Sequence, residues 1–186
     1  MGEARLAAAL YLPDAVKDHM SDYLIEIRRA TRDDAPVVAE HRVSMFRDMG
    51  SAEPSIEAAL REVAAAHIGE AMAAGEYVAW LAHPPGEPKR IVGGAGVQLR
   101  RLLPRPDADG RRVLIGREGI VLNVYVEPDY RRRGVARRLM EAIISWVPET
   151  DIVRLVLHAS DEGRPLYERM GFEPTNEMRY TGALRR

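Results

Sequence analysis

A glycine flanked by arginines has the clearest chemical meaning in this sequence. Arg131-Arg132-Arg133-Gly134-Val135-Ala136 stands between an apolar run, residues 120–126, and a segment whose apolar residues recur at helical spacing. A strand, a tight turn and a helix in this order leave several backbone N–H groups unpaired at the positive end of the helix dipole. Such a turn favours a phosphate or pyrophosphate, and at Gly134 the anion can approach the backbone with no Cβ in the way.

Two well-known phosphate loops do not fit these residues. The P-loop requires GxxxxGK followed by Ser or Thr, and the dinucleotide fingerprint requires GxGxxG, whereas Gly134 stands alone. The five arginines between Tyr130 and Leu139 have other interpretations: a solvated helix start, a nuclear-localisation run, or a nucleic-acid contact with strongly salt-dependent affinity. The adjacent glycine turn favours phosphate binding.

The pattern Arg131-x-x-Gly134-x-Ala136 resembles the Q/R-x-x-G-x-G/A loop of the GNAT superfamily of N-acetyltransferases. It follows a strand ending in Val-Glu-Pro-x-Tyr, as expected for that loop. Further along, Tyr167-Glu168-Arg169-Met170-Gly171-Phe172 looks like the Y-x-x-x-G-F at the end of the superfamily's next helix. The resemblance spans about Ile25 to Tyr180 and is specific for fold and cofactor, but not for the acceptor.

The resemblance implies acetyl-CoA as co-substrate and no metal. The pantetheine arm would lie where the strand before the loop splays from its neighbour, and the pyrophosphate would meet the loop amides. Ser160 stands where related sequences often have an asparagine. The implied cofactor-binding residues are Val124, Tyr125, Val126, Arg131, Arg132, Arg133, Gly134, Val135, Ala136, Arg137 and Ser160.

Tyr167 matches the position at which many family members hold a tyrosine near the thioester sulfur, so the resemblance implies that it is the general acid for the departing thiolate. The alternative is a tyrosine that packs under the cofactor. The helix and loop region from Arg42 to Asp48 would border the acceptor site, with Arg42, Met45, Phe46, Arg47 and Asp48 as candidate contacts; each is alternatively a packing or surface residue.

The general base is less defined, although an alkylammonium must lose a proton before it attacks. Some family members carry a catalytic glutamate at the position matching Ile120, so this chain departs from that version. Glu118 shares a face with Ile120, Leu122 and Val124 if no bulge intervenes, which makes it a candidate base. Asn123 orients a water or the acceptor, or else bonds a neighbouring strand. His158 has a suitable pKa, but a histidine at a strand end is more often simply hydrogen-bonded.

Composition fits one soluble globular domain. The chain has 186 residues, 46% hydrophobic content and no long apolar run, and its net charge of −1 implies no bulk attraction to nucleic acid or membranes. The absence of cysteine excludes disulfides, thiolate metal sites and an acyl-cysteine intermediate. The apolar patch near the start lacks the features of an export signal. We expect an N-terminal extension, residues 1–22, and a single domain, residues 23–186.

The hydrophobic periodicity predicts the secondary structure. We expect a strand at Tyr23–Arg29, a helix ending at Met45 or Phe46, a helix at Ser55–Ala74, and a hairpin of strands Glu76–Ala82 and Ile91–Leu99. A loop, Leu102–Arg117, should precede the central strand and the helix from Val135. A strand at Ile152–His158, a short helix at Gly163–Met170 and a last strand at Met178–Leu184 complete the chain. The expected fold class is α/β (α+β): a mixed, mostly antiparallel GNAT-like sheet flanked by helices, with a splayed strand pair at the CoA site.

The resulting prediction is a cytoplasmic acyltransferase that moves acetyl from acetyl-CoA to a primary amine by direct attack in a ternary complex. The acceptor is a small molecule or peptide, with no nucleic-acid or membrane partner, and a homodimer is one of the oligomeric states found among relatives. The alternative is a catalytically silent CoA-binding sensor or interaction module with the same fold.

Overall fold

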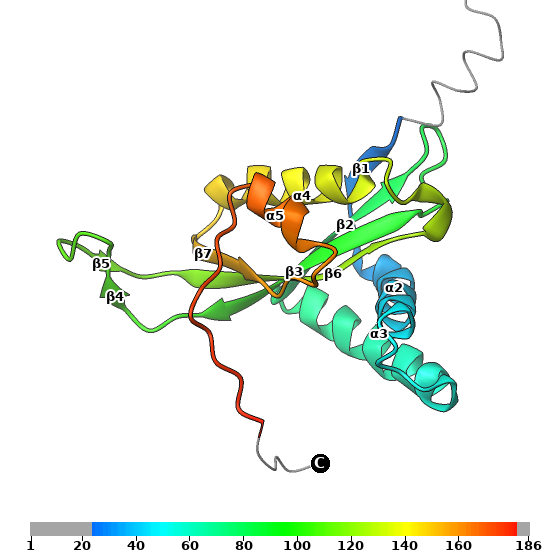
Figure 1. Ribbon diagram of the computed structural model, residues 1–186, viewed down its shortest axis with the longest axis horizontal. Coiled ribbons are helices and arrows are strands. Elements are labelled where there is room, and N and C mark those ends of the chain that lie inside the picture. The colour runs from blue at the N-terminus through cyan, green and yellow to red at the C-terminus, as the bar shows by residue number, and fades with distance from the viewer. Residues whose placement is uncertain (1–23, 182–186) are drawn as a thin grey trace, which may run out of the picture.

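The computed structural model describes residues 24–181, which form one central sheet with helices on both faces (Figure 1). The expected extension, residues 1–22, lies outside this range, so the division into an extension and a domain stays a prediction. Short 3-10 turns precede α2, α3 and α4 and follow α4. The helices and strands are β1 Glu26–Arg29, α2 Ala35–Asp48, α3 Glu57–Ala73, β2 Tyr77–His83, β3 Gly93–Arg101, β4 Arg105–Pro106, β5 Val113–Leu114, β6 Arg117–Val126, α4 Val135–Trp146, β7 Ile152–Leu157 and α5 Arg164–Arg169.

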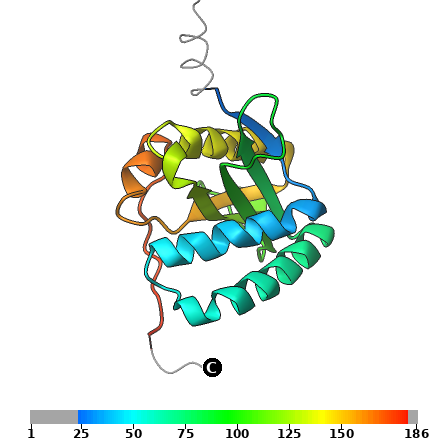
Figure 2. The same ribbon diagram turned by 90° about the vertical axis from the view of Figure 1, so that its right-hand side faces the viewer.

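The main sheet has the strand order β1-β2-β3-β6-β7, and only the β6–β7 pair is parallel. The expected hairpin is confirmed as β2 and β3. Helices α4 and α5 lie on one face of the sheet, and α2 and α3 lie side by side on the other (Figures 1 and 2). The predicted mixed, mostly antiparallel sheet flanked by helices is therefore confirmed. No helix among residues 24–181 is both long and apolar enough to cross a bilayer.

Each face of the sheet has its own apolar core. On the α4 side, Val97 and Val121 pack with Leu139, Met140 and Ile143, all of them buried. This burial explains the amphipathic spacing of the α4 sequence. On the other side, small side chains from the alanine-rich α3 and from α2 pack against Leu81. Strand β2 contributes to both cores, because its alternate residues face opposite sides of the sheet: Trp80 and Ala82 lie in the first core, and Leu81 in the second.

Two expectations about secondary structure are wrong. The predicted loop at residues 102–117 contains the two-stranded β4–β5 hairpin, which projects from the end of the sheet (Figure 1). Residues 178–181 form no strand, and residues 182–184 lie outside the described part of the chain. Alternating apolar residues suggest a strand only where a partner is available to pair with them. Here Met178 and Tyr180 stay 93% and 71% exposed.

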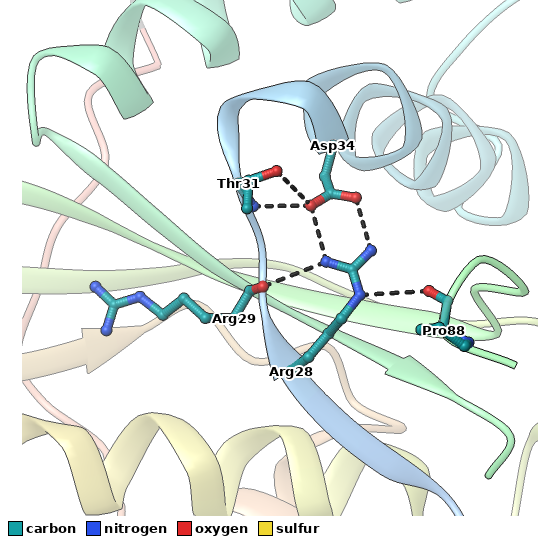
Figure 3. Close-up of polar contacts among 5 residues, drawn as sticks. All are labelled: Arg28, Arg29, Thr31, Asp34 and Pro88. Atoms are coloured by element: carbon teal, nitrogen blue, oxygen red, sulfur yellow. Dashed lines mark hydrogen bonds and ion pairs between the residues drawn. The ribbon is translucent and has the colours of Figure 1, made fainter. Parts of the chain in front are cut away.

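A polar cluster ties β1 to the start of α2 (Figure 3). The Asp34 carboxylate accepts two hydrogen bonds from the Arg28 guanidinium, at 2.8 and 2.7 Å, and one from the Thr31 amide at 2.8 Å. The Thr31 hydroxyl lies 3.1 Å from the same carboxylate. The hydrogen bonds from Arg28, followed by those from Thr31, lower the pKa of Asp34 to about 2 against the opposing effect of burial. The folded protein therefore favours the ionised form of Asp34.

The Asp34→Asn variant should be less stable than the wild type by about 1–2 kcal/mol at pH 7. This free energy corresponds to the lowered pKa of the Asp34 carboxyl, and it is reduced because the group is partly exposed to solvent. Because the folded pKa lies below the ordinary value of 3.8, this contribution is complete above pH 4 and is lost as the pH falls toward 2. Urea unfolding of both proteins between pH 2 and 7 measures the difference. The exposed neighbour supplies the control, since Asp33→Asn should change stability by less than about 0.5 kcal/mol. A pH-independent difference for Asp34→Asn would contradict this account.

Candidate functional site

The loop between β6 and α4 exposes a row of backbone amides. Gly134 caps α4 with a left-handed backbone, φ 80° and ψ 3°, and Arg132 also has a positive φ of 60°. A Cβ at Gly134 would meet no atom within 4 Å, so glycine is needed here for its backbone conformation and not for packing. The first helical bond runs from the Arg138 amide to the Gly134 carbonyl at 3.1 Å. The amides of Val135, Ala136 and Arg137 consequently have no acceptor within the helix.

The arginines of this loop do not all point outward. The Nε of Arg131 donates to the Val126 carbonyl at 2.9 Å, and its guanidinium pairs with Asp48 at the end of α2. Arg137 pairs with Glu141 one turn further along α4, at 2.8 Å. Arg131 therefore connects the loop to both β6 and α2. A contact between its side chain and a phosphate stays a prediction.

The expected splay next to the loop is present. Parallel pairing of β6 with β7 runs from Arg117↔Ile152 to Val121↔Leu157, where β7 ends, while β6 continues to Val126. The amide of Glu127 donates to the Val92 carbonyl on the β3 side, at 2.9 Å. Backbone groups alternate in direction along a strand, so the amides of Val124 and Val126 point the other way, into the opening.

A β-bulge interrupts β6 at this opening. Gly96 pairs with Leu122 and Gly94 with Tyr125, so β6 takes three residue steps where β3 takes two. Asn123 occupies the bulge with a φ of 54°, a conformation that asparagine tolerates better than most residues. The expectation that Glu118 shares a face with Val124 is therefore wrong. The bulge reverses the alternation, and Val124 packs against the core on the α4 side.

The bulge turns the Asn123 side chain toward α2, where it joins a buried polar network. Its Oδ1 accepts a hydrogen bond from Nη1 of Arg42 at 2.7 Å, and its Nδ2 donates to the Tyr77 hydroxyl at 3.1 Å. The Arg42 guanidinium also lies over the Phe46 ring, 4.8 Å from its centroid. Both ends of the Asn123 amide are thus engaged. Asn123 connects β6 to β2 and α2, and a direct contact with water or acceptor stays a prediction.

Sequence reasoning missed two aromatic residues here: Tyr77, which belongs to this network, and His41, which precedes Arg42 on α2. His41 packs against Tyr125 with ring centroids 5.2 Å apart, and burial lowers its pKa to about 4. Burial raises the pKa of Tyr77 to about 12. The available signal was the glycines of β3: a Cβ at Gly94 would lie 2.8 Å from Nδ1 of His41, and one at Gly96 would lie 1.9 Å from the Tyr77 hydroxyl. Glycines within a strand mark such close approaches.

Tyr167 lies in α5, on the same face of the sheet as α4 (Figure 1). Its half-buried ring packs against the α4-side core and meets the Phe172 ring edge-on, with centroids 6.2 Å apart. Burial raises the pKa of its phenol above the ordinary value of 10.0, so the group is protonated at neutral pH, as a general acid must be. The Ser160 hydroxyl accepts a hydrogen bond from the Gly163 amide at 3.2 Å at the start of this turn. The cofactor role of Ser160 stays a prediction.

Glu118 lies at the opposite end of β6 from the loop. Its side chain is 1% exposed, and its two carboxylate oxygens pair with Arg100 on β3 and Arg154 on β7. Asn123 lies five positions further along the chain, or about 16 Å along a strand. Arg100 and Arg117 also line a cavity of about 810 Å³ at this end of the sheet. A base must reach its substrate, and burial together with an ion pair on each oxygen keeps this carboxylate from doing so, which favours a structural role for Glu118.

We therefore expect Glu118→Gln to lower stability by about 1–3 kcal/mol, because it leaves two guanidiniums without their shared counter-ion while those guanidiniums remain partly solvated. Turnover should change less than about threefold. Thermal unfolding and steady-state kinetics on one preparation separate the two roles. Glu141→Gln, which breaks the exposed pair with Arg137, is the control and should cost under about 0.5 kcal/mol. A hundredfold loss of kcat at unchanged stability would restore Glu118 as the base.

The other candidate base, His158, lies beyond the end of β7. Its side chain is 68% exposed, and its Nε2 lies 3.8 Å from Glu177. This exposure and the nearby Glu177 side chain agree with a surface histidine.

Comparisons with known proteins agree with this geometry. Residues 76–174 match the family model described as an acetyltransferase (GNAT) domain. A GCN5-related N-acetyltransferase from Ralstonia eutropha JMP134 superposes with a TM-score of 0.71 and 32% identity, covering 84% of this chain and 97% of that one. A predicted acetyltransferase from Clostridium acetobutylicum, crystallised with acetyl-CoA, superposes with a TM-score of 0.68 and 25% identity, covering 86% and 96%.

A curated relative gives a shorter match. The uncharacterized N-acetyltransferase YitH of Bacillus subtilis is 38% identical over 66 residues, which make up 36% of this chain and 23% of that protein. The match thus spans less than a quarter of the relative's length.

Proposed function

Because the chain belongs to the GNAT acetyltransferase family, we propose that it moves an acetyl group from acetyl-CoA to a primary amine of a small molecule or peptide. The observation that carries the proposal is the position of the unpaired amides around Gly134 beside the opening between β6 and β7. The reaction is a direct attack in a ternary complex, since the chain has no cysteine to form an acyl-cysteine intermediate.

The residues at this site suit the two parts of the carrier. A diphosphate needs several hydrogen-bond donors in a positive field, which the amides of residues 132–137 and the dipole of α4 supply. The pantetheine arm carries amide groups that pair with a strand. The Val124 and Val126 amides are turned into the opening and are available to this arm. The Val126 carbonyl is not available, because it already accepts a hydrogen bond from Arg131. When bound, acetyl-CoA supplies the activated acyl thioester.

Two proton transfers accompany acyl transfer. The amine nitrogen forms a bond to the acyl carbon, the carbon–sulfur bond breaks, the amine releases a proton, and the departing thiolate takes one up. Tyr167 is protonated at neutral pH and is the proposed donor to sulfur. His41 does not serve as the base, because with a pKa of about 4 it binds a proton too weakly at pH 7. The amine proton passes to water.

A thiol-release assay with acetyl-CoA across a panel of primary amines tests the proposal, together with calorimetric titration of acetyl-CoA. We expect binding and amine-dependent thiol release. Tight binding without release on any amine would support the alternative, a CoA-binding sensor. Strongly salt-dependent DNA binding that CoA does not displace would instead assign the arginine cluster to nucleic acid.

A further inference from the structure

Arg42 is a cation that contacts neutral groups at the site. Within residues 24–181 no carboxylate lies at ion-pair distance from its guanidinium, whereas Arg47 on the same helix pairs with Glu57, and Arg131 pairs with Asp48. Its partners are neutral: the Asn123 amide at 2.7 Å and the Phe46 ring at 4.8 Å. A positive charge held by neutral groups in a partly buried position favours an anion from outside the chain.

The position of Arg42 places this charge beside the reacting centre. Asn123 lies at the bulge, just past the last β6–β7 pair, Val121↔Leu157. Helices α4 and α5 cover one face of the sheet, and α2 covers the other (Figures 1 and 2). Tyr167 belongs to α5 and Arg42 to α2. Since the phosphate loop leads into α4, acetyl-CoA should enter from the side of the sheet that α4 covers. The side covered by α2 is then left for the acceptor.

The network fixes the orientation of the guanidinium. Asn123 cannot rotate freely, because its Nδ2 donates to the Tyr77 hydroxyl at 3.1 Å, and that hydroxyl occupies the space which the missing side chain of Gly96 provides. Arg42 uses one N–H group on Asn123 and stacks on Phe46. Its remaining donors keep the planar fork that matches two oxygens of a carboxylate or phosphate. This orientation before binding reduces the entropy cost of holding the anion.

We propose that Arg42 binds an anionic group of the acceptor, so that the substrate is a primary amine carrying a carboxylate or a phosphate. This inference rests on the proposed transferase function and specifies its substrate class. Asn123 is then a positioning residue that acts through Arg42.

The test uses matched pairs of amines: an amino acid against its amide, and an aminoalkyl phosphate against the corresponding amino alcohol. The wild type should prefer the anionic member of at least one pair by about tenfold or more in kcat/KM, and the preferred pair identifies carboxylate or phosphate. Arg42→Gln should lower kcat/KM for that member about 10–100-fold, mainly through KM, and change the neutral member less than about threefold. Arg42→Lys should fall between them because it keeps the charge but loses the fork.

Arg61→Gln is the matched control on the neighbouring helix α3, where Arg61 pairs with Glu40, and it should leave both members of each pair unchanged. Thermal unfolding and acetyl-CoA affinity show whether the Arg42 variants remain folded. Equal rates on both members in the wild type, or a preference that survives in Arg42→Gln, would overturn the inference and leave the transferase function intact. If no amine is acetylated, binding of the same pairs to the CoA-loaded protein decides: selective binding of the anionic member that Arg42→Gln abolishes supports the inference, and its absence overturns it.

Discussion

The Tyr167→Phe variant should lose at least about a hundredfold in kcat, the lower end of the effect of removing a general acid. Its dissociation constant for acetyl-CoA should stay within about twofold of the wild-type value, because the ring still packs against Phe172 and the α4-side core. Steady-state kinetics with a saturating amine, combined with calorimetric titration of acetyl-CoA, measures the two effects separately.

The pH profile gives an independent readout for Tyr167. The acid must be protonated, so the wild-type rate should fall as the pH rises through a pKa above 10.0, in the direction set by burial of the phenol. Tyr167→Phe should lack this decrease. Tyr180→Phe, at an exposed position, serves as the control and should behave as the wild type. Unchanged turnover in Tyr167→Phe would leave the tyrosine as a packing residue only.

The Gly134→Glu variant should weaken acetyl-CoA binding by about a hundredfold or more. A carboxylate at this position would repel the diphosphate and occupy the open space through which the anion approaches the amides. Calorimetric titration measures the loss, which should appear equally for CoA without the acetyl group.

Gly110→Glu is the matched control for Gly134→Glu. Gly110 also has a positive φ, 67°, with open space around its Cα, but it lies in the β4–β5 hairpin. The substitution adds the same charge and comparable backbone strain there, so it should lower stability without changing acetyl-CoA affinity. Retained affinity in Gly134→Glu would count against the loop as the diphosphate site.

The parts of the fold that sequence predicted are those with a local cause. The turn at Gly134 follows from one glycine between an apolar run and an amphipathic helix, and the β2–β3 hairpin follows from two apolar runs separated by a proline-rich connection. The family resemblance supplied the splay, which the end of β7 at Leu157 now explains. The turn and the hairpin depend on residues close together in the chain, whereas the splay depends on where two separate strands end.

The parts that sequence did not predict depend on distant partners. The bulge at Asn123 has no local signal beyond the tolerance of asparagine for positive φ. The Arg42–Asn123–Tyr77 network joins residues 81 and 46 positions apart. The ion pairs of Glu118 likewise come from two neighbouring strands. Which face a β6 side chain reaches is decided by that bulge, so the assignment of Glu118 as a base could not be made from alternation alone.

The most direct test of the central claim is a crystal structure of the protein with acetyl-CoA bound. It should show the diphosphate hydrogen-bonded to backbone amides of residues 132–137 and the thioester sulfur within hydrogen-bond reach of the Tyr167 hydroxyl, about 3–3.5 Å. A diphosphate held elsewhere, for example in the cavity lined by Arg100 and Arg117, or a Tyr167 hydroxyl remote from sulfur, would contradict the account.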